Sequence, residues 1–143
     1  MRQEFRKCLN RGKIIRFPQG KRLVGKELDS ARSDLGDAKF GFVHSRYKWS
    51  TIQGYYSMYH TSRALIYSKG YRERSHYCLF VALQELFVDR GALDVELAES
   101  FLLAMRLRET ADYRSDFSEE GALSVIERAE QLLERAEEIL ETG

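Results

Sequence analysis

Apolar residues along the chain recur at intervals of three and four, which is the spacing of one face of an α-helix. The pattern is clearest in two stretches, residues 24–42 and 119–141. The first stripe is Val24, Leu28, Ala31, Leu35, Ala38 and Phe42, and the second is Ala122, Val125, Ala129, Leu132, Ala136 and Ile139. Charged residues fill most of the other positions, so both stretches predict amphipathic helices that bury one side.

Residues 49–69 follow a different pattern, because apolar and aromatic side chains cover most of the helical circumference there. They are Ile52, Tyr55, Tyr56, Met58, Tyr59, Ala64, Leu65, Ile66 and Tyr67. A helix that is apolar nearly all round is typical of the centre of a bundle. We therefore expect this helix to be the central one and to end at Gly70, a natural residue for the position after a helix.

Cap residues mark the remaining helices. Ser75 is a suitable N-cap for a helix ending near Gly91, Asp94 for the next, and Ser118 for the last. No alternating run bounded by hairpin turn residues predicts a strand. Short connections make neighbouring helices antiparallel. The predicted fold class is all-α, an up-and-down helical bundle of four long helices plus a short N-terminal helix or arm.

Residues 1–23 form a separate basic segment in this prediction, before a bundle that spans residues 24–143. Gly12, Pro18 and Gly20 interrupt any long helix there. The segment could be a short helix lined by Phe5, Cys8, Leu9 and Ile15, or a loosely attached basic arm.

The net charge of +1 conceals an asymmetry along the chain. Residues 1–50 carry 13 Lys and Arg against 5 Asp and Glu, whereas residues 91–143 carry 5 against 14. The basic and acidic parts could attract each other within the fold or a dimer, or the basic part could bind nucleic acid.

The composition, with 43% hydrophobic and 31% charged residues over 143 positions, is that of one ordinary globular domain. No apolar run approaches the roughly 20 residues of a membrane span, and no apolar segment of a secretory signal follows the basic N-terminus. Two cysteines, Cys8 and Cys78, do not make a disulfide framework and fit a reducing compartment. We therefore expect a cytoplasmic protein without membrane contact.

The usual catalytic signatures are absent: the chain has neither a phosphate-binding loop nor a nucleophile elbow. His44, His60 and His76 are each 16 residues apart and lack the spacing of zinc ligands. We expect no metal and no cofactor.

One candidate constellation lies in the central helix, where Tyr56, Tyr59, His60 and Arg63 can share a broad face. Aromatic rings beside an arginine can stack on a nucleotide and neutralise its charge. Alternatively, the tyrosines belong to the core with a polar tip, and His60 is an interior histidine with a satisfied partner.

A second constellation continues the apolar stripe of the helix after Asp94, where Arg108 and Asp112 are four residues apart. A charge on a buried stripe needs a partner, because desolvation costs several kcal/mol. Arg108 could pair with Asp112, pair across a dimer, or hold a phosphate.

Three segments together resemble HEPN domains over about residues 24–141. They are Trp49–Leu65 followed by Lys69-Gly70, Ser75-His76 at the start of the next helix, and Arg108-Glu-Thr-Ala-Asp-Tyr113 before an acidic last helix. The chain is most similar to the small archaeal and bacterial branch catalogued as an uncharacterised protein family (UPF0332-like). The resemblance implies a homodimer, and many members are encoded beside a minimal nucleotidyltransferase in toxin–antitoxin pairs.

Active members of the family are metal-independent RNases, with an Arg followed after four to six residues by a His. Arg108 matches the Arg, but Tyr113 stands at the His position, and no histidine follows His76. A phenol, with an ordinary pKa near 10, is a poor base at pH 7.

The sequence therefore predicts a HEPN-like homodimeric binding protein, the partner of a nucleotidyltransferase in a toxin–antitoxin-type pair, with nucleotide or RNA as ligand. The ligand-binding candidates are Tyr56, His60, Arg63, Arg108 and Asp112. The alternative is an RNase toxin in which Arg108 works with a histidine from another helix, His60 or His76, for which Arg108, Tyr113, His60 and His76 are the catalytic candidates.

Overall fold

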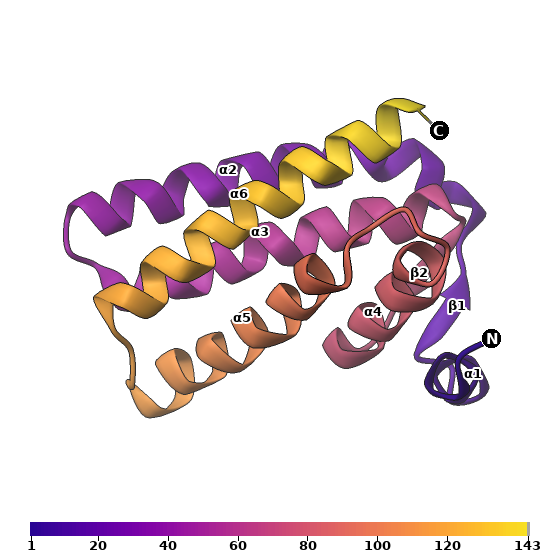
Figure 1. Ribbon diagram of the computed structural model, residues 1–143, viewed down its shortest axis with the longest axis horizontal. Helices are drawn as coiled ribbons and strands as arrows, with labels where there is room; N and C mark the ends of the chain where they lie inside the picture. The colour runs from indigo at the N-terminus through magenta and orange to yellow at the C-terminus, as the bar shows by residue number, and fades with distance from the viewer. Residues whose placement is uncertain (143) are drawn as a thin grey trace.

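Four long helices lie side by side in the computed structural model, which describes residues 1–142 (Figure 1). They are α2 (Val24–Val43), α3 (Tyr47–Ser68), α5 (Val95–Arg114) and α6 (Glu119–Thr142). The shorter elements gather at one end of these helices: α1 (Gln3–Asn10), β1 (Ile14–Arg16), the 3₁₀-helix η1 (Pro18–Leu23), β2 (Tyr71–Glu73), α4 (His76–Leu83) and the π-helix η2 (Gln84–Val88). The predicted all-α bundle is confirmed.

The predicted cap residues lie where the helices begin and end. Ser75 accepts a hydrogen bond from the backbone N–H of Cys78 at the start of α4, and Ser118 accepts one from Gly121 at the start of α6. Asp94 occupies the N-cap position of α5 without a side-chain cap bond. Gly70, with a φ of +79°, follows α3 in the left-handed conformation that glycine adopts without steric cost.

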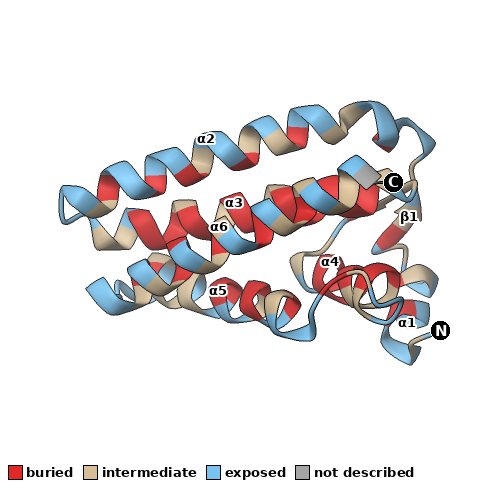
Figure 2. Ribbon diagram, turned by 45° about the horizontal axis from the view of Figure 1, so that its top comes forward, coloured by how far each residue is buried: buried red, intermediate tan, exposed pale blue. Residues whose placement is uncertain are grey.

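Helix α3 lies at the centre of the bundle, as its pattern predicts, and is buried along most of its length (Figure 2). Gly54 lets α6 approach closely, because a Cβ at this position would lie 2.8 Å from Val125 Cγ1. This central position means that side chains on α3 reach α2, α4, α5 and α6, so α3 carries the groups around which a site can be built.

The prediction that the chain has no strand is wrong. Strands β1 and β2 form a short antiparallel pair in which Ile14 lies opposite Glu73 and Arg16 opposite Tyr71. They are joined by η1, α2 and α3 rather than by a hairpin turn, and each has only three residues. A search for alternating runs with turn residues between them cannot detect such a pair.

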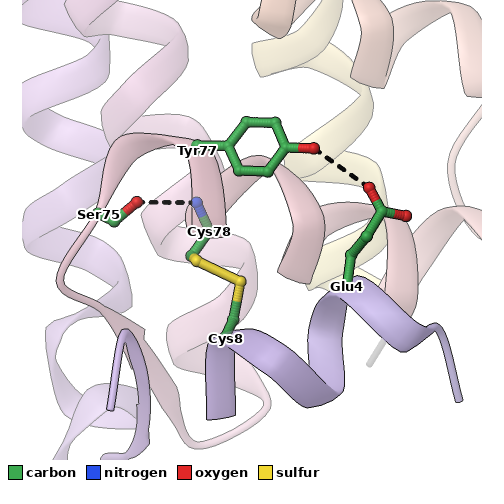
Figure 3. Close-up of a disulfide and its surroundings, with 5 residues drawn as sticks. All are labelled: Glu4, Cys8, Ser75, Tyr77 and Cys78. Atoms are coloured by element: carbon green, nitrogen blue, oxygen red, sulfur yellow. Dashed lines mark hydrogen bonds between the residues drawn. A yellow bond between two sulfur atoms is a disulfide. The ribbon is translucent and has the colours of Figure 1, made fainter. Parts of the chain in front are cut away.

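The N-terminal segment forms α1, and Phe5 and Cys8 on this helix are buried. Cys8 and Cys78 are joined by a disulfide bond between α1 and α4 (Figure 3). The expectation that the two cysteines stay unpaired is therefore wrong, because the fold brings residues 70 positions apart to a Cα–Cα distance of 5.9 Å. The reducing compartment inferred from unpaired thiols loses its basis. The division of the chain at residue 24 stays a prediction.

Some of the basic residues within residues 1–50 form ion pairs with acidic residues of the last helix. Arg32 and Lys39 of α2 lie 2.9 Å and 3.0 Å from Glu137 and Glu130 of α6. These pairs are about half exposed, so each contributes less than about 1 kcal/mol to stability. Attraction between the basic and acidic parts within the fold thus accounts for part of the positive charge of residues 1–50. In the part of the chain that the structure describes, no helix is both long and apolar enough to cross a bilayer.

Candidate functional site

Arg108 of α5 reaches the central helix and contacts its tyrosines. Its Nη2 donates a hydrogen bond of 2.8 Å to the hydroxyl of Tyr56 and lies 3.7 Å from a carboxylate oxygen of Asp112. Its guanidinium carbon lies 5.8 Å from the centre of the Tyr55 ring and 5.3 Å from that of Tyr56. The side chain is 15% exposed. The arrangement holds one positive charge in a defined place at the edge of the core.

His76, the first residue of α4, packs against the same tyrosines. Its Nδ1 lies 2.5 Å from the hydroxyl of Tyr55, and its ring stacks on Tyr59 with 4.6 Å between ring centres. It also meets the Tyr56 ring edge-on at 6.4 Å. Since Arg108 contacts Tyr55 and Tyr56 as well, residues from three helices form one group, which we call the Arg108–His76 cluster: Tyr55, Tyr56, Tyr59, His76, Arg108 and Asp112.

The electrostatics of the cluster follow from burial. Burial raises the pKa of Tyr55 well above its ordinary value, so this hydroxyl stays protonated. The buried Tyr55 hydroxyl can donate its hydrogen to Nδ1 of His76, which leaves the ring hydrogen of the neutral imidazole on Nε2. Burial and, secondarily, the positive charge of Arg108 lower the pKa of His76. At pH 7 the cluster thus presents a guanidinium and an imidazole N–H donor.

His60 and Arg63 do not join this cluster. Nδ1 of His60 lies 2.5 Å from Glu27 of α2, and Arg63 lies 3.3 Å from Glu27 and 3.2 Å from Glu73 of β2. Arg63 also donates a hydrogen bond to the Tyr67 hydroxyl. Glu27 and Glu73 are themselves buried, and they are the partners of the His60 ring and of the Arg63 guanidinium. This geometry corresponds to the alternative in which His60 is an interior histidine with a satisfied partner. Of the predicted ligand-binding residues, Arg108 does contact both Tyr56 and Asp112.

Tyr113 lies on the solvent side of Arg108. Its side chain is 74% exposed, and the centre of its ring is 5.6 Å from the guanidinium carbon of Arg108. A residue at this position therefore lies beside the fixed positive charge and is open to a ligand from solution.

Comparison with known proteins places the chain in one family. A family model described as "HEPN domain" covers residues 25–142, which is most of the chain. The chain belongs to the HEPN domain family. It is 27% identical over 106 residues to "Putative toxin MJ0605" of Methanocaldococcus jannaschii, covering 73% of this chain and 79% of that protein. It is 29% identical over 102 residues to a "UPF0332 protein" of Thermotoga maritima, covering 70% of this chain and 77% of the relative.

These matches confirm the resemblance to HEPN domains and to the small archaeal and bacterial branch.

Among residues 1–142 of this HEPN domain, no group of three or more His, Cys, Asp or Glu is placed to hold a metal ion. A cavity of about 700 Å³ lies on another side of the bundle, lined by Arg2, Glu99, Arg106 and Arg128 among others, and does not include the Arg108–His76 cluster.

Tyr55 is the residue of the cluster that the sequence does not single out as a site residue. It appears there only as one more aromatic side chain of the central helix. Tyr55 contacts His76, which is 21 positions away in the chain, and no local sequence pattern predicts that contact. The three-residue strand β2 and the turn before α4 bring His76 back to α3.

Acidification should destabilise this HEPN domain through His76. A histidine whose pKa is lowered by folding binds protons more readily in the unfolded chain. Its contribution to stability is therefore fully present above about pH 6.5, the ordinary pKa of histidine, and is lost as the pH falls through the lowered pKa. We expect the free energy of unfolding to be lower at about pH 5 than at about pH 7.5, measured by urea denaturation.

The His76→Gln variant should lose part of this pH dependence. His44→Gln is the matched control, because His44 is exposed just after α2 and its ring contacts Phe40. Equal pH dependence in the His76→Gln and His44→Gln variants would contradict the assignment to His76.

Proposed function

We propose that this HEPN domain protein is a homodimeric component of a toxin–antitoxin-type pair that binds the phosphates of RNA or of a nucleotide at the Arg108–His76 cluster. The observation that carries the proposal is the convergence of Arg108 from α5 and His76 from α4 on the tyrosines of α3. The relative named as a putative toxin supports the toxin–antitoxin setting. The partner in the pair is a minimal nucleotidyltransferase.

The chemistry of the cluster favours binding of an anion. Arginine binds phosphate oxygens through two parallel N–H donors, and a neutral imidazole with its hydrogen on Nε2 adds a third donor. Tyr113 supplies an exposed ring on which a base can stack. Asp112, 3.7 Å from Arg108, only partly balances the guanidinium. These donors suit a phosphodiester with an adjoining base.

The C-terminal end of α5 favours pairing of two copies. Tyr113 is 74% exposed there, and Phe117, in the connection to α6, is 46% exposed. Exposed apolar side chains that are close together are typical of interaction surfaces. A homodimer through this end of α5 would place two Arg108–His76 clusters near its interface. Sedimentation of a stable monomer at micromolar concentration would contradict it.

Replacing Arg108 by Gln should weaken binding of a short single-stranded RNA roughly tenfold or more, because a charge-assisted phosphate contact contributes about 1.5–3 kcal/mol. The dissociation constant of a fluorescein-labelled RNA is measured by anisotropy at several salt concentrations. Affinity of the unmodified protein should fall steeply with salt, and the slope should be smaller for the variant.

Arg106→Gln provides the control for this experiment. Arg106 lies on the same helix and is exposed, but it lines the cavity on the other side of the bundle. This variant removes the same charge and should change the affinity little. Binding that is independent of salt, binding absent at every salt concentration, or equal losses for both variants would overturn the proposed ligand site.

A second candidate function is an RNase in which Arg108 works with His76. One observation favours His76 over His60 here: His76 contacts Tyr55 and Tyr56 beside Arg108, whereas His60 faces Glu27 and Asp34. Against this candidate, the Nδ1 of His76 is engaged by Tyr55, and catalysis would require this hydrogen bond to rearrange when the ring takes up a proton.

A further inference from the structure

The disulfide between Cys8 and Cys78 borders a surface cavity of about 270 Å³. Both cysteines line this cavity, although little of either residue is exposed, 5% for Cys8 and 8% for Cys78. The cavity lies between α1 with the residues that follow it and the start of α4, the two elements that the disulfide joins in Figure 3. A small molecule in the cavity therefore lies beside both residues of the disulfide.

The cavity is lined by more positive than negative charge. Lys7, Arg11 and Lys13 line it and are exposed, and none of them forms an ion pair with another residue that the structure describes. The acidic residue of the lining, Glu4, accepts a hydrogen bond from the hydroxyl of Tyr77, and Figure 3 shows its carboxylate directed to that hydroxyl. Three unpaired cations beside one engaged carboxylate attract an anion to the disulfide.

We propose that Cys8–Cys78 is a thiol–disulfide exchange site whose co-substrate is a small anionic thiol. The cavity admits the thiol, and Lys7, Arg11 and Lys13 raise its local concentration and stabilise its thiolate. The site is separate from the phosphate-binding function proposed above and does not depend on it.

The positions of the two cysteines determine which sulfur is attacked. Cys78 lies in the first turn of α4, where the helix dipole stabilises a thiolate, whereas Cys8 lies in the last turn of α1, where the dipole opposes one. The better leaving group is the thiol with the lower pKa. The incoming thiolate thus forms a bond to Sγ of Cys8, the Cys8–Cys78 bond breaks, and Cys78 leaves as a thiolate that takes a proton from water.

A second thiolate completes the exchange by attacking the mixed disulfide. It releases the Cys8 thiolate and the small molecule as its own symmetric disulfide, so the protein gains two electrons and two protons. Cys78 is two residues after His76 in the first turn of α4. Opening the disulfide therefore removes the covalent link between α1 and the helix that positions His76.

The test compares thiols of different charge on the oxidised full-length protein. The probes are glutathione (anionic), 2-mercaptoethanol (neutral) and cysteamine (cationic). Opening of the bond is followed by acid quenching, alkylation and intact mass. Each rate is divided by the rate of the same thiol with bis(2-hydroxyethyl) disulfide, which removes differences in intrinsic reactivity. We expect the normalised rate with glutathione to exceed that with cysteamine on the order of tenfold at low salt, and the difference to shrink at high salt.

A variant with Lys7→Gln, Arg11→Gln and Lys13→Gln should lose the preference for glutathione and keep its normalised rate with 2-mercaptoethanol. The matched control carries Lys21→Gln, Arg22→Gln and Lys26→Gln, which remove the same charge from exposed positions outside the cavity. The control should keep the preference. If the unmodified protein shows no preference for glutathione, the proposal is overturned. It is also overturned if both variants lose the preference to the same extent.

Peptide mapping of samples alkylated early in the reaction tests the direction of attack. Trypsin releases Cys8 within residues 8–11 and Cys78 within residues 75–90, so the two sites are read separately. We expect glutathione on Cys8 and the alkyl group on Cys78. The reverse assignment would overturn the proposed leaving group.

Discussion

Replacing both cysteines by alanine should lower the free energy of unfolding by about 4 kcal/mol, a figure that the loop-closure model gives for a cross-link between residues 70 positions apart. The disulfide stabilises chiefly because it restricts the unfolded chain, and a loop of this length is long on that scale. It also holds α1 against α4, where Phe5 and Cys8 supply the buried contacts of α1. The measurement is urea denaturation of the oxidised protein and of the Cys8→Ala/Cys78→Ala variant.

The reduced unmodified protein should resemble the double variant in this experiment, since both lack the cross-link. Tyr77→Phe is the control for local contacts, because it removes the hydrogen bond to Glu4, the neighbouring link between α1 and α4 (Figure 3). An exposed hydrogen bond contributes about 1 kcal/mol or less, so this variant should stay near the unmodified protein. A double variant within 1 kcal/mol of the oxidised protein would contradict the expected stabilisation.

The helices of this fold could be predicted from the sequence because their signals are local. The stripe from Val24 to Phe42 repeats every three or four residues, and it becomes the side of α2 that faces α3. The circumference of residues 49–69 is apolar nearly all round, and it becomes the central helix. Ser75 and Ser118 supply cap hydrogen bonds within their own first turn. Each of these features depends on neighbours within four residues.

The features that sequence reasoning missed all depend on contacts between distant residues. The β1–β2 pair joins Ile14 to Glu73, and the disulfide joins Cys8 to Cys78. These contacts are connected: the short sheet and the disulfide both fix the N-terminal segment against the turn before α4. The contact between the N-terminal segment and the turn before α4 therefore accounts for both wrong predictions, the one about strands and the one about the cysteines.

The candidate site illustrates the same limit at the level of single residues. The i, i+4 relation of Arg108 and Asp112 is local, and the structure contains their contact at 3.7 Å. Tyr56, His60 and Arg63 also share α3, yet only Tyr56 faces Arg108, because Glu27 and Glu73 engage the other two. Sequence analysis offers both His60 and His76 as substitutes for the family's histidine, whose position Tyr113 occupies. The path of the chain through β2 is what separates His76 from His60.

The Tyr113→His variant should gain RNase activity of at least about 100-fold over the unmodified protein, which should cleave RNA slowly or not at all. Cleavage by the 2′-hydroxyl of RNA needs a group that accepts a proton and a group that donates one, and such general acid–base catalysis contributes roughly 10²–10⁴-fold. Arginine, the residue at position 108, can stabilise phosphate charge but stays protonated. A phenol ordinarily has a pKa near 10, far from the pH of the reaction, whereas an imidazole titrates near neutrality.

The structure makes position 113 suitable for that gain. Its side chain is exposed and lies beside the Arg108 guanidinium, so a histidine there could reach a phosphodiester bound by Arg108. His76 is a weaker substitute, because its Nδ1 is hydrogen-bonded to Tyr55 and its pKa is lowered by burial, which keeps it unprotonated at pH 7 and unable to act as a general acid. One substitution would therefore supply a proton carrier next to the proposed phosphate-binding site.

The assay incubates the purified protein with a mixed RNA pool without divalent metal over roughly pH 6 to 9. Tyr113→Phe is the control, since it removes the hydroxyl without adding a titratable group and should leave cleavage unchanged. Adding Arg108→Ala to Tyr113→His should abolish the gain, because phosphate charge is then no longer stabilised. Robust cleavage by the unmodified protein that disappears in Arg108→Ala would overturn the prediction. No gain in Tyr113→His, with RNA affinity retained, would mean that Arg108 binds phosphate in a geometry that does not suit cleavage.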